Sequence, residues 1–454
     1  MPHEERSGHQ TDERHHVVVV GAGFGGLAVV RGLHGAPVRV TLVDANNYHT
    51  FQPLLYQVAT AGLDADDVAH PVRGIFPRRA RRPVEVVMGE VDEIETGTDT
   101  GDRWIELTDG RRIGYDTLVV AAGAVSNDFG IDGVEEHAFP LKTLDDAIAL
   151  RTHLLRTFER AAAGDAIVPG ALDVVVSGGG PTGVEMAGGI AELYAKVLAE
   201  DFPDLPVEQA RIVIVEPRDR LLPPFHPDSS ERAAATLHRL GVEVRTGVGI
   251  DRVEIDGVHL SDGEHVPAAT VVWAAGVRAS PLAARLGVEP AGGGRIPVDD
   301  DLSVTGLDGV FALGDIAAAR GPEGDPLPQV AQPAIQGGAH VARQILRRLD
   351  GQDTEPFEYI DKGSMATIGR HDAVTELANG WRFGGFPGWV AWLGLHLVYL
   401  MGMRNRLNVF VNWCWNYLTY DRASRLLSST DLDRPAASAG RSRGSDEGDA
   451  LPQE

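Results

Sequence analysis

The feature that most constrains this chain is a glycine pattern that occurs twice, each time directly after a β-branched run. The first copy, Gly21-Ala-Gly23-Phe-Gly-Gly26, follows the run at residues 15–20, and the second, Gly178-Gly-Gly180-Pro-Thr-Gly183, follows the run at residues 173–177. Both have the spacing G-x-G-x-x-G between an expected strand and an expected helix. This internal duplication predicts two β-α-β units, whose crossovers require parallel sheets.

These two glycine turns, the first and second cradles, have the residues needed to hold a dinucleotide. The first glycine allows a tight turn, the second lets the backbone approach a pyrophosphate, and the third lets helix and strand pack closely. An acid ends the next strand in each unit, Asp44 after the first cradle and Glu216 after the second. Glu216 lies 38 residues after Gly178, which we attribute to a longer helix and the acidic loop at 200–206.

A carboxylate at that strand end can accept hydrogen bonds from ribose hydroxyls, so each cradle predicts a dinucleotide site. At the second cradle, Glu216 favours NAD over NADP because it repels a 2′-phosphate. Arg218 and Arg220 nearby moderate this preference, although exposed arginines are more often plain surface charges. Three more strands end in turns of small residues that bring backbone near a ligand: Ala122 with Gly123, Gly276, and Gly314 with Asp315.

The duplication predicts an α/β fold with two Rossmann-like dinucleotide-binding domains. A disordered tail is expected at 429–454, where Ser, Gly, Ala, Arg and acidic residues predominate.

Composition excludes several classes of function. The 454 residues carry 41 Lys plus Arg against 65 Asp plus Glu, a formal charge of −24, which disfavours nucleic-acid binding. Cys414 is the single cysteine, so no intrachain disulfide, Cys-x-x-Cys pair or iron–sulfur cluster can form, and electron chemistry needs a borrowed cofactor. No metal site is expected. The leader at 1–14 is charged and His-rich without an apolar stretch, which predicts the cytoplasmic side.

Two dinucleotides in one chain are most simply a flavin and a nicotinamide, between which a hydride passes. From residue 15 to about 425, the chain resembles the two-dinucleotide-binding-domain flavoproteins. The resemblance implies that the first domain consists of two segments, 14–140 and 285–348, with the second domain at 141–284 inserted between them and a C-terminal region at 349–428. The resemblance implies FAD at Gly21, Gly23, Gly26, Asp44, Ala122, Gly123, Gly314 and Asp315. It implies NADH at Gly178, Gly180, Gly183, Glu216 and Gly276. The alternative for Asp315 is that its side chain only caps a local turn.

Disulfide reductases of that superfamily are excluded because they need a cysteine pair. The run Ala331-Gln-Pro-Ala-Ile-Gln336-Gly-Gly resembles the A-Q-x-A-x-Q-x-G signature of type II NADH dehydrogenases. The segments 42–56 and 362–369 also resemble that family. The resemblance implies a single-subunit enzyme that passes two electrons from NADH through FAD to a membrane quinone, without proton pumping.

The same resemblance implies four catalytic residues. Gln332 and Gln336 would lie at the flavin edge opposite the nicotinamide, with Gln336 near the quinone carbonyl. Glu185 would lie near flavin and nicotinamide, and Lys362 would pair with it. The alternatives are solvent-facing glutamines, a glutamate that only stabilises its helix terminus, and a surface pair between Lys362 and Asp361.

Residues 381–427, the C-terminal strip, differ from the rest of the chain. Five of the seven Trp and five arginines against one aspartate lie here, a local charge of +4. An expected helix of 15 residues from Trp389 would be about 22 Å long, too short for a hydrocarbon core of about 30 Å. Aromatic and basic residues suit an anionic membrane surface, so residues 349–428 are expected to form a C-terminal membrane-associating region. A homodimer interface or a buried core helix remains the alternative.

The sequence therefore predicts a peripheral NADH:quinone oxidoreductase on the cytoplasmic face of the cell membrane. Two other functions stay open at this point. One is an NADH-dependent reductase of a soluble acceptor such as a ferredoxin. The other is an NADH-sensing flavoprotein that acts through partner binding.

Overall fold

The computed structural model describes residues 14–76, 84–97, 101–164, 168–419 and 424–427, and these divide into two compact units. Unit 1 comprises the described residues up to Thr50, Ala69–Val125 and Val277–Lys362. Unit 2 comprises Phe51–Val68, Ser126–Gly276 and the described residues from Gly363 onward. The expected disordered tail at 429–454 and residues 1–13 of the leader lie outside the described residues. Packing thus groups residues 51–68 and the C-terminal region with the second cradle.

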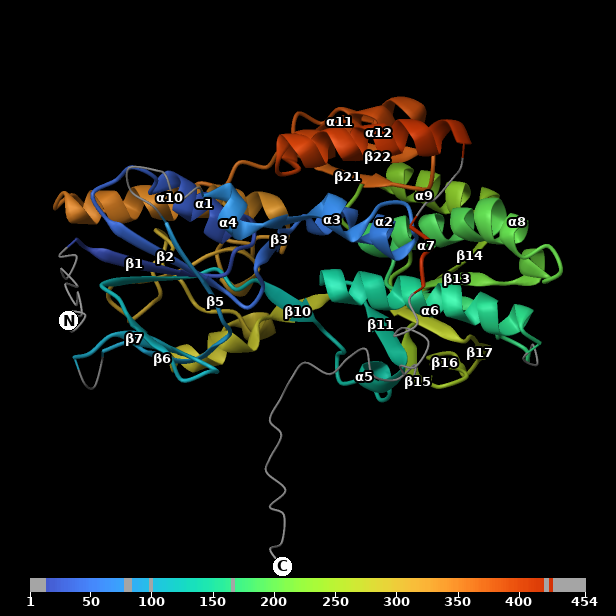
Figure 1. Cartoon of the computed structure of the whole chain (residues 1–454), viewed down its shortest axis with the longest axis horizontal. Helices are drawn as coiled ribbons and strands as arrows, with labels where there is room; N and C mark the ends of the chain where they lie inside the picture. Colours follow the sequence, from blue (N-terminus) through green and yellow to red (C-terminus); the bar gives the residue numbers. More distant parts are fainter. Residues whose placement is uncertain (1–13, 77–83, 98–100, 165–167, 420–423, 428–454) are drawn as a thin grey trace, which may run out of the picture. The chain divides into compact units, whose positions relative to one another are not determined.

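Unit 1 is built on a five-stranded parallel sheet in the order β20-β9-β1-β2-β5 (Figure 1). Its strands are β1 (His16–Val20), β2 (Arg39–Asp44), β5 (Glu85–Met88), β9 (Thr117–Val120) and β20 (Val310–Ala312). The helices α1 (Phe24–Gly32) and α10 (Ala331–Leu349) pack against each other. Gly338 permits this approach, because a Cβ there would collide with the carbonyl oxygen of Gly25. The buried β-branched strands make the core of this unit.

Smaller elements complete unit 1 and the links to unit 2. They are β3 (Tyr48–Thr50), β4 (Ala69–Pro71), α4 (Val72–Ile75), β6 (Val91–Glu95), β7 (Trp104–Leu107), β8 (Arg112–Gly114), β10 (Ala124–Ser126) and β19 (Val277–Ala279).

Unit 2 repeats the plan with a five-stranded parallel sheet in the order β11-β18-β12-β13-β14. Its strands are β11 (Ala138–Pro140), β12 (Val174–Ser177), β13 (Ile212–Glu216), β14 (Val242–Thr246) and β18 (Thr270–Trp273). The long gap before Glu216 is filled by α7 (Pro181–Leu193), a π-helical turn (Tyr194–Leu198) and α8 (Ala199–Asp201), yet β13 still pairs with β12. The duplication predicted from the glycine pattern is confirmed.

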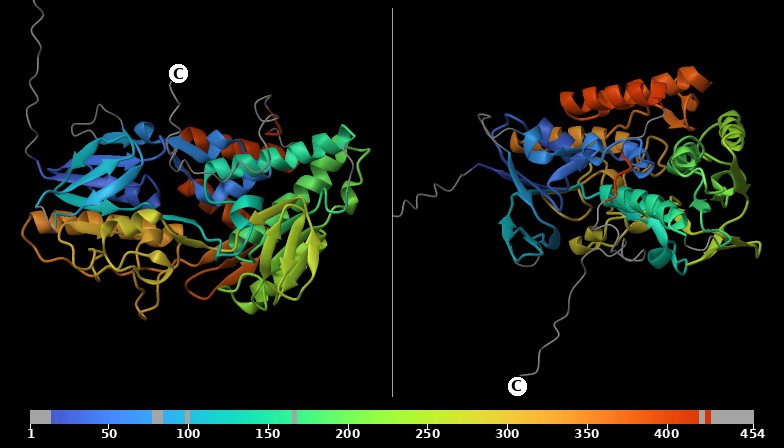
Figure 2. Two further views of the ribbon diagram at one scale, coloured as in Figure 1. Left: turned by 90° about the horizontal axis from the view of Figure 1, so that it is seen from below. Right: turned by 45° about the vertical axis from the view of Figure 1, so that its right-hand side comes forward.

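The remaining elements of unit 2 surround this sheet (Figure 2). They are α2 (Leu55–Ala59), α3 (Ala65–Val68), α5 (Val134–His137), α6 (Leu144–Ala162), α9 (Pro227–Arg239), β15 (Ile250–Glu254), β16 (Gly257–Leu260), β17 (His265–Pro267), β21 (Ser364–Thr367), β22 (Ala373–Glu376), β23 (Arg382–Gly384), α11 (Gly385–Tyr399) and α12 (Met403–Thr419).

The helix expected from Trp389 begins four residues earlier, so that expectation was wrong. Pro387 falls in the first turn of α11, where a missing N–H removes no intrahelical bond. The buried carboxylate of Asp372 also accepts the N–H of Gly385 at 2.9 Å and so anchors the helix start. Glycine and proline therefore mark the beginning of this helix rather than a break before it.

The basic charge of the C-terminal strip is partly used inside the fold. The Arg406 guanidinium donates to the carbonyl oxygens of Leu400 and Val398, both at 2.7 Å, where α11 ends. Arg425 forms an ion pair with Asp201 at 3.2 Å. Arg382 and Arg404 are exposed, while Arg422 lies outside the described residues. The number of arginines that can face a membrane is therefore smaller than the count in the sequence.

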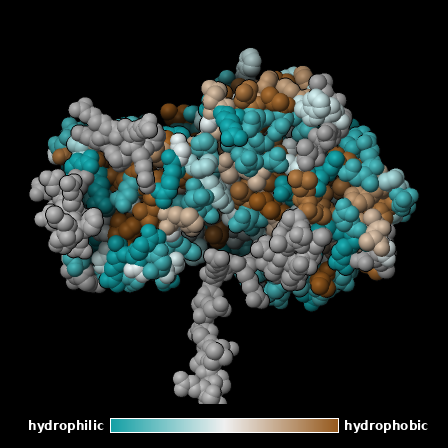
Figure 3. Space-filling model, viewed as in Figure 1, coloured by the Kyte–Doolittle hydropathy of each residue, from teal (hydrophilic) through white to brown (hydrophobic). Residues whose placement is uncertain are grey.

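Apolar side chains gather over α11 and α12, which lie side by side (Figure 1, Figure 3). The most exposed include Val398, Met403, Leu407 and Trp415, each more than half exposed. Trp392 is 1% exposed, so at least this one of the five tryptophans of the strip packs inside the fold. Among the described helices, none combines the length and the apolar character needed to cross a bilayer.

Candidate functional site

The two cradles have nearly the same backbone geometry. Gly21 has φ +103° and Gly178 has φ +102°, and each N–H donates to a carbonyl of the next strand at 2.8 Å. A Cβ on Gly26 would collide with the carbonyl oxygen of Gly21, and one on Gly183 with that of Gly178. The first and third glycines are therefore required by the turn itself, as the spacing predicted.

The middle glycines of the cradles show where a ligand fits. A Cβ added to Gly23 or Gly180 would have no atom within 4 Å. Both residues are N-caps, of α1 and α7, and within the described chain no side chain caps either helix. Free N–H groups and open space at a helix N-terminus suit a pyrophosphate. Both cradles thus fit a dinucleotide.

The strand-end acids hold the cradle loops and retain acceptor capacity. Asp44 accepts the N–H of Ala22 at 2.6 Å and of Asn46 at 2.7 Å. Glu216 accepts the N–H of Gly179 at 2.7 Å and of Arg218 at 3.0 Å. Burial raises the pKa of Asp44, while its two backbone hydrogen bonds act in the opposite direction. Each carboxylate keeps lone pairs for a ribose hydroxyl.

The other predicted turn residues lie at strand ends of the two sheets. In unit 1, Gly123 has φ +68°, with Ala122 directly before it against Gly21. Gly314 has φ +74°, and a Cβ added to it would lie 3.2 Å from the Ala334 Cβ. Asp315 beside it is half-buried. In unit 2, a Cβ on Gly276 would come within 2.9 Å of the Phe129 ring. Their cofactor contacts stay predictions.

The two glutamines on α10 differ in the hydrogen bonds of their side-chain amides. Gln336 is held at both ends of its amide by Ile360, donating to its carbonyl at 2.9 Å and accepting from its N–H at 3.0 Å. Gln332 has a buried Oε1 that has no hydrogen-bond partner within the described chain. Gln336 therefore clamps the segment before Lys362, and the role of each glutamine toward a quinone stays a prediction.

Glu185 is a buried acid of unit 2 whose pKa is strongly raised. It lies on α7, is buried, and accepts the N–H of Thr367 on β21 at 3.3 Å. The Trp392 indole lies near the carboxyl group, although its Nε1 completes no hydrogen bond of standard geometry. Burial raises the pKa of Glu185 to about 8, against the smaller effects of Thr367 and Trp392. Such a carboxyl group keeps its proton at neutral pH.

Trp392 is held against Glu185 by other aromatic rings. His396 stacks on it at 3.9 Å between centroids, and Tyr56 and Trp413 contact it at 6.2 and 6.1 Å. His396 Nδ1 lies 2.7 Å from the Trp392 carbonyl oxygen, so this nitrogen carries the proton. Burial lowers the pKa of His396 to about 4, which keeps its ring neutral. The predicted partner Lys362 is exposed and belongs to unit 1.

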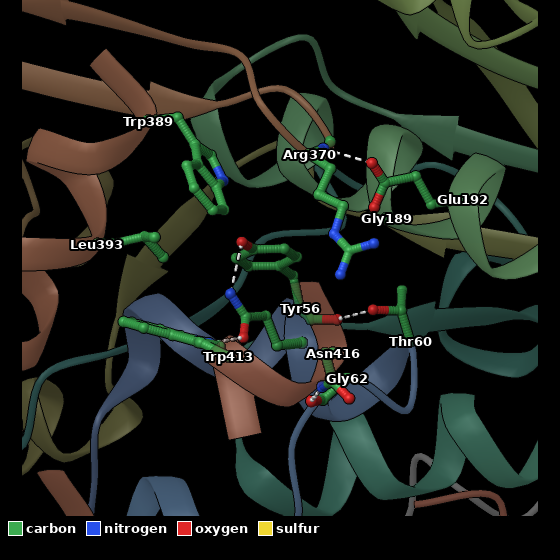
Figure 4. A pocket seen from close by; sticks show the side chains of 12 residues that line it. Tyr56, Thr60, Gly62, Gly189, Glu192, Arg370, Trp389, Leu393, Trp413 and Asn416 are labelled. Carbon is green, nitrogen blue, oxygen red and sulfur yellow. Dashed lines mark hydrogen bonds between the residues drawn. The ribbon is translucent and has the colours of Figure 1, made fainter. Parts of the chain in front are cut away.

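A cavity of about 100 Å³ in unit 2 lies between α2, α7, α11 and α12 (Figure 4). Its wall includes the rings of Tyr56, Trp389 and Trp413 and the Arg370 side chain. Gln57 donates to the Tyr56 hydroxyl at 2.9 Å and accepts from the Trp413 indole at 2.8 Å. The space is smaller than the roughly 150 Å³ that accommodates a benzene ring in a protein. Tyr56 lines this cavity and also contacts Trp392.

Sequence reasoning did not identify Trp392, His396, Tyr56 or Thr367 as neighbours of the Glu185 site. Thr367 is 182 positions from Glu185, and no local pattern connects them. The segment containing Tyr56 was indicated by the sequence only through its resemblance to the family.

Comparisons with known proteins agree with this geometry. A family model for pyridine nucleotide-disulphide oxidoreductases matches residues 15–338, and one for the NDH2 C-terminal domain matches residues 362–420. The chain is 38% identical to the type II NADH:quinone oxidoreductase Ndh of Mycobacterium tuberculosis, over 96% of both chains. It is 34% identical to the type II NADH:quinone oxidoreductase of Staphylococcus aureus, over 80% of this chain and 89% of the relative.

The structure is similar to that of NDH2 from Plasmodium falciparum, solved in complex with NADH. The TM-score is 0.82 at 20% identity, covering 90% of this chain and 99% of the other. At this identity the likeness shows the fold, and it confirms the predicted two-dinucleotide architecture. With the family models and the two relatives, the resemblance inferred from the sequence motifs is also confirmed. The chain belongs to the type II NADH:quinone oxidoreductases.

Proposed function

We propose that this chain oxidises NADH and passes two electrons to a membrane quinone through bound FAD, without proton pumping. The observation that carries the proposal is the pair of cradles with equivalent geometry, one in each unit, in a chain of this family. When bound, FAD supplies the hydride-accepting and electron-donating chemistry that no side chain provides. The first cradle with Asp44 would hold FAD, and the second with Glu216 would hold NADH.

Glu185 is proposed as the proton source for quinone reduction. Quinone reduction consumes protons as well as electrons, and a buried carboxyl group with a pKa of about 8 retains a proton to deliver at neutral pH. The cavity beside Tyr56 is proposed as part of the quinone's route from the membrane. Its aromatic walls suit a flat ring, and Trp389 and Trp413 belong to the same helices that carry the exposed apolar surface.

We further propose that α11 and α12 bind an anionic membrane on the cytoplasmic face. Exposed apolar side chains support burial in the lipid interface, and Arg382 and Arg404 support attraction to anionic headgroups. The same surface is available to a second copy of the chain, which is the predicted homodimer. Sedimentation with and without lipid vesicles distinguishes these two uses.

Flavin absorbance tests the proposed function directly. The purified protein is expected to be yellow and to lose its visible flavin absorbance when mixed with NADH without oxygen. A short-chain quinone then restores the absorbance. A colourless protein that cannot take up FAD, or a flavin that NADH bleaches but no quinone reoxidises, would overturn the proposal.

Glu216→Ala is expected to weaken the preference for NADH over NADPH by roughly tenfold to 100-fold. Loss of the carboxylate removes an acceptor for the ribose and a repulsion against a 2′-phosphate, and one charge-assisted hydrogen bond contributes about 1.5–3 kcal/mol. The measurement is kcat/KM for both coenzymes. Asp44→Ala is the matched control in the first cradle and should weaken FAD retention without changing that ratio. An unchanged NADPH preference in Glu216→Ala would contradict the assignment.

Replacing Val398, Leu407 and Phe410 by serine is expected to weaken binding to anionic vesicles by more than about tenfold. Each methylene that enters lipid contributes about 0.8 kcal/mol, and a tenfold change in binding corresponds to about 1.4 kcal/mol. The loss of three apolar side chains therefore weakens binding by more than tenfold. The matched control replaces Val168, Ile255 and Ile360, which are 60%, 81% and 67% exposed outside the strip. Equal vesicle binding by both triple variants in a flotation assay would contradict the membrane assignment.

A further inference from the structure

Three potential metal ligands meet on the small antiparallel sheet of β15, β16 and β17. Glu254, His259 and His265 place one ligand atom each within 4.8 Å of the others, the single such group of three among the described residues. Glu254 Oε2 lies 3.0 Å from His259 Nε2, and the two imidazole rings are 4.7 Å apart between centroids.

The strand register fixes this meeting of side chains. His259 and His265 are direct cross-strand partners, and Arg252 is the partner of His259 on the other side. Glu254 lies two residues after Arg252 and therefore shares its face of the sheet. The opposite face, with Val253, Val258 and Val266, is buried in the core of unit 2.

We propose that Glu254, His259 and His265 bind a divalent transition-metal ion of the zinc type. Two imidazoles and one carboxylate are typical of such ions, whereas calcium and magnesium prefer all-oxygen sites. Ligands of a tetrahedral zinc ion are about 3.4 Å apart, given Zn–N and Zn–O distances near 2.1 Å. The side chains, a third to two fifths exposed, can close this gap by small rotations. Water can complete the coordination.

Neighbouring side chains orient the proposed ligands. Arg252 Nη2 pairs with Glu254 Oε1 at 2.9 Å and orients the carboxylate. Glu254 Oε2 faces His259 Nε2 at 3.0 Å, and the ion would replace the hydrogen bond between these two atoms. Asp256 Oδ1 lies 3.8 Å from His265 Nε2 and offers a further oxygen. The ion would join all three strands.

The sequence alone predicted no metal site, because the three residues have no ligand spacing typical of a helix or a zinc ribbon. Only the hairpin register brings them together. The ion would brace β15, which the Val253 N–H joins to the Asp132 carbonyl at 2.9 Å. A metal site here would therefore stiffen the contact between β15 and Asp132, which precedes β11 of the unit 2 sheet. This role is separate from the proposed electron transfer.

Titration of the tag-free, FAD-loaded full chain with Zn²⁺ and Co²⁺ tests the site. Wild type is expected to bind one equivalent at this site with a visible Co²⁺ spectrum and a raised melting temperature in Zn²⁺. His259→Gln and His265→Gln should each weaken that binding by more than about tenfold and abolish the melting shift. His238→Gln, an exposed histidine on α9, is the matched control.

The leader contains histidines of its own, so the comparison between variants, rather than total metal content, is decisive. If wild type binds neither ion saturably, or if both glutamine variants bind like wild type, the proposal is overturned. Flavin content and NADH oxidation without added metal should be the same in all four proteins, which separates failure of this site from failure of the proposed function.

Discussion

Glu185→Gln is expected to raise the free energy of unfolding at alkaline pH by roughly 5 kcal/mol relative to wild type, once the difference between the two proteins at acidic pH is subtracted. The carboxyl group has a pKa of about 8 in the folded chain against an ordinary value of 4.5. Between these values the folded protein keeps a proton that the unfolded chain releases. Rising pH therefore favours unfolding of wild type, and glutamine removes this contribution because it does not titrate.

Urea unfolding near pH 5 and near pH 9 gives the free energy of unfolding of both proteins. The effect is the amount by which the difference between variant and wild type grows from the lower to the higher pH. Glu231→Gln, which replaces an exposed glutamate on α9, is the matched control and should follow wild type at both pH values. Parallel behaviour of Glu185→Gln and wild type across this range would show that the carboxyl group is not buried as the structure has it. Slower quinone reduction, with flavin reduction by NADH intact, is the expected functional counterpart.

The cradles were predictable because each is a local pattern. Gly21, Gly26 and Asp44 lie within one β-α-β unit, and backbone sterics alone dictate where glycine must stand. The position of Glu216 at the end of the next strand was also predicted correctly despite the long interval, because an insertion between paired strands leaves their register intact. The sheet order and the acid positions follow from the same rules of connection.

The surroundings of Glu185 were not predictable in the same way. Thr367 and Trp392 reach it from β21 and α11, and such contacts depend on packing between elements far apart in the chain. On α11, apolar residues occur on all sides, so the sequence does not indicate which tryptophan faces the core. Arg406 illustrates the same limit, because composition does not distinguish an arginine that ends a helix from one that meets lipid.

Trp392→Ala is expected to destabilise the protein by about 3–5 kcal/mol and to lower the pKa of Glu185 toward its ordinary value. The first effect is the loss of a buried indole, which is 1% exposed and packs on His396 and Tyr56. The second follows because burial is the main cause of the raised pKa, and a cavity at the carboxyl group admits water. Trp415→Ala, at a tryptophan that is 58% exposed on α12, controls for the loss of an indole.

The two effects can be separated by combining the substitutions. If the indole keeps water from the carboxyl group, the pH-dependent part of the unfolding free energy shrinks in Trp392→Ala, and adding Glu185→Gln changes it little further. Trp392→Phe should preserve much of the pH dependence because a phenyl ring still covers the carboxyl group. If Trp392→Ala instead lowers stability equally at every pH, the indole only fills space, and the burial that keeps Glu185 protonated comes from other elements packed against α7. That outcome would move the control of the proposed proton source away from α11.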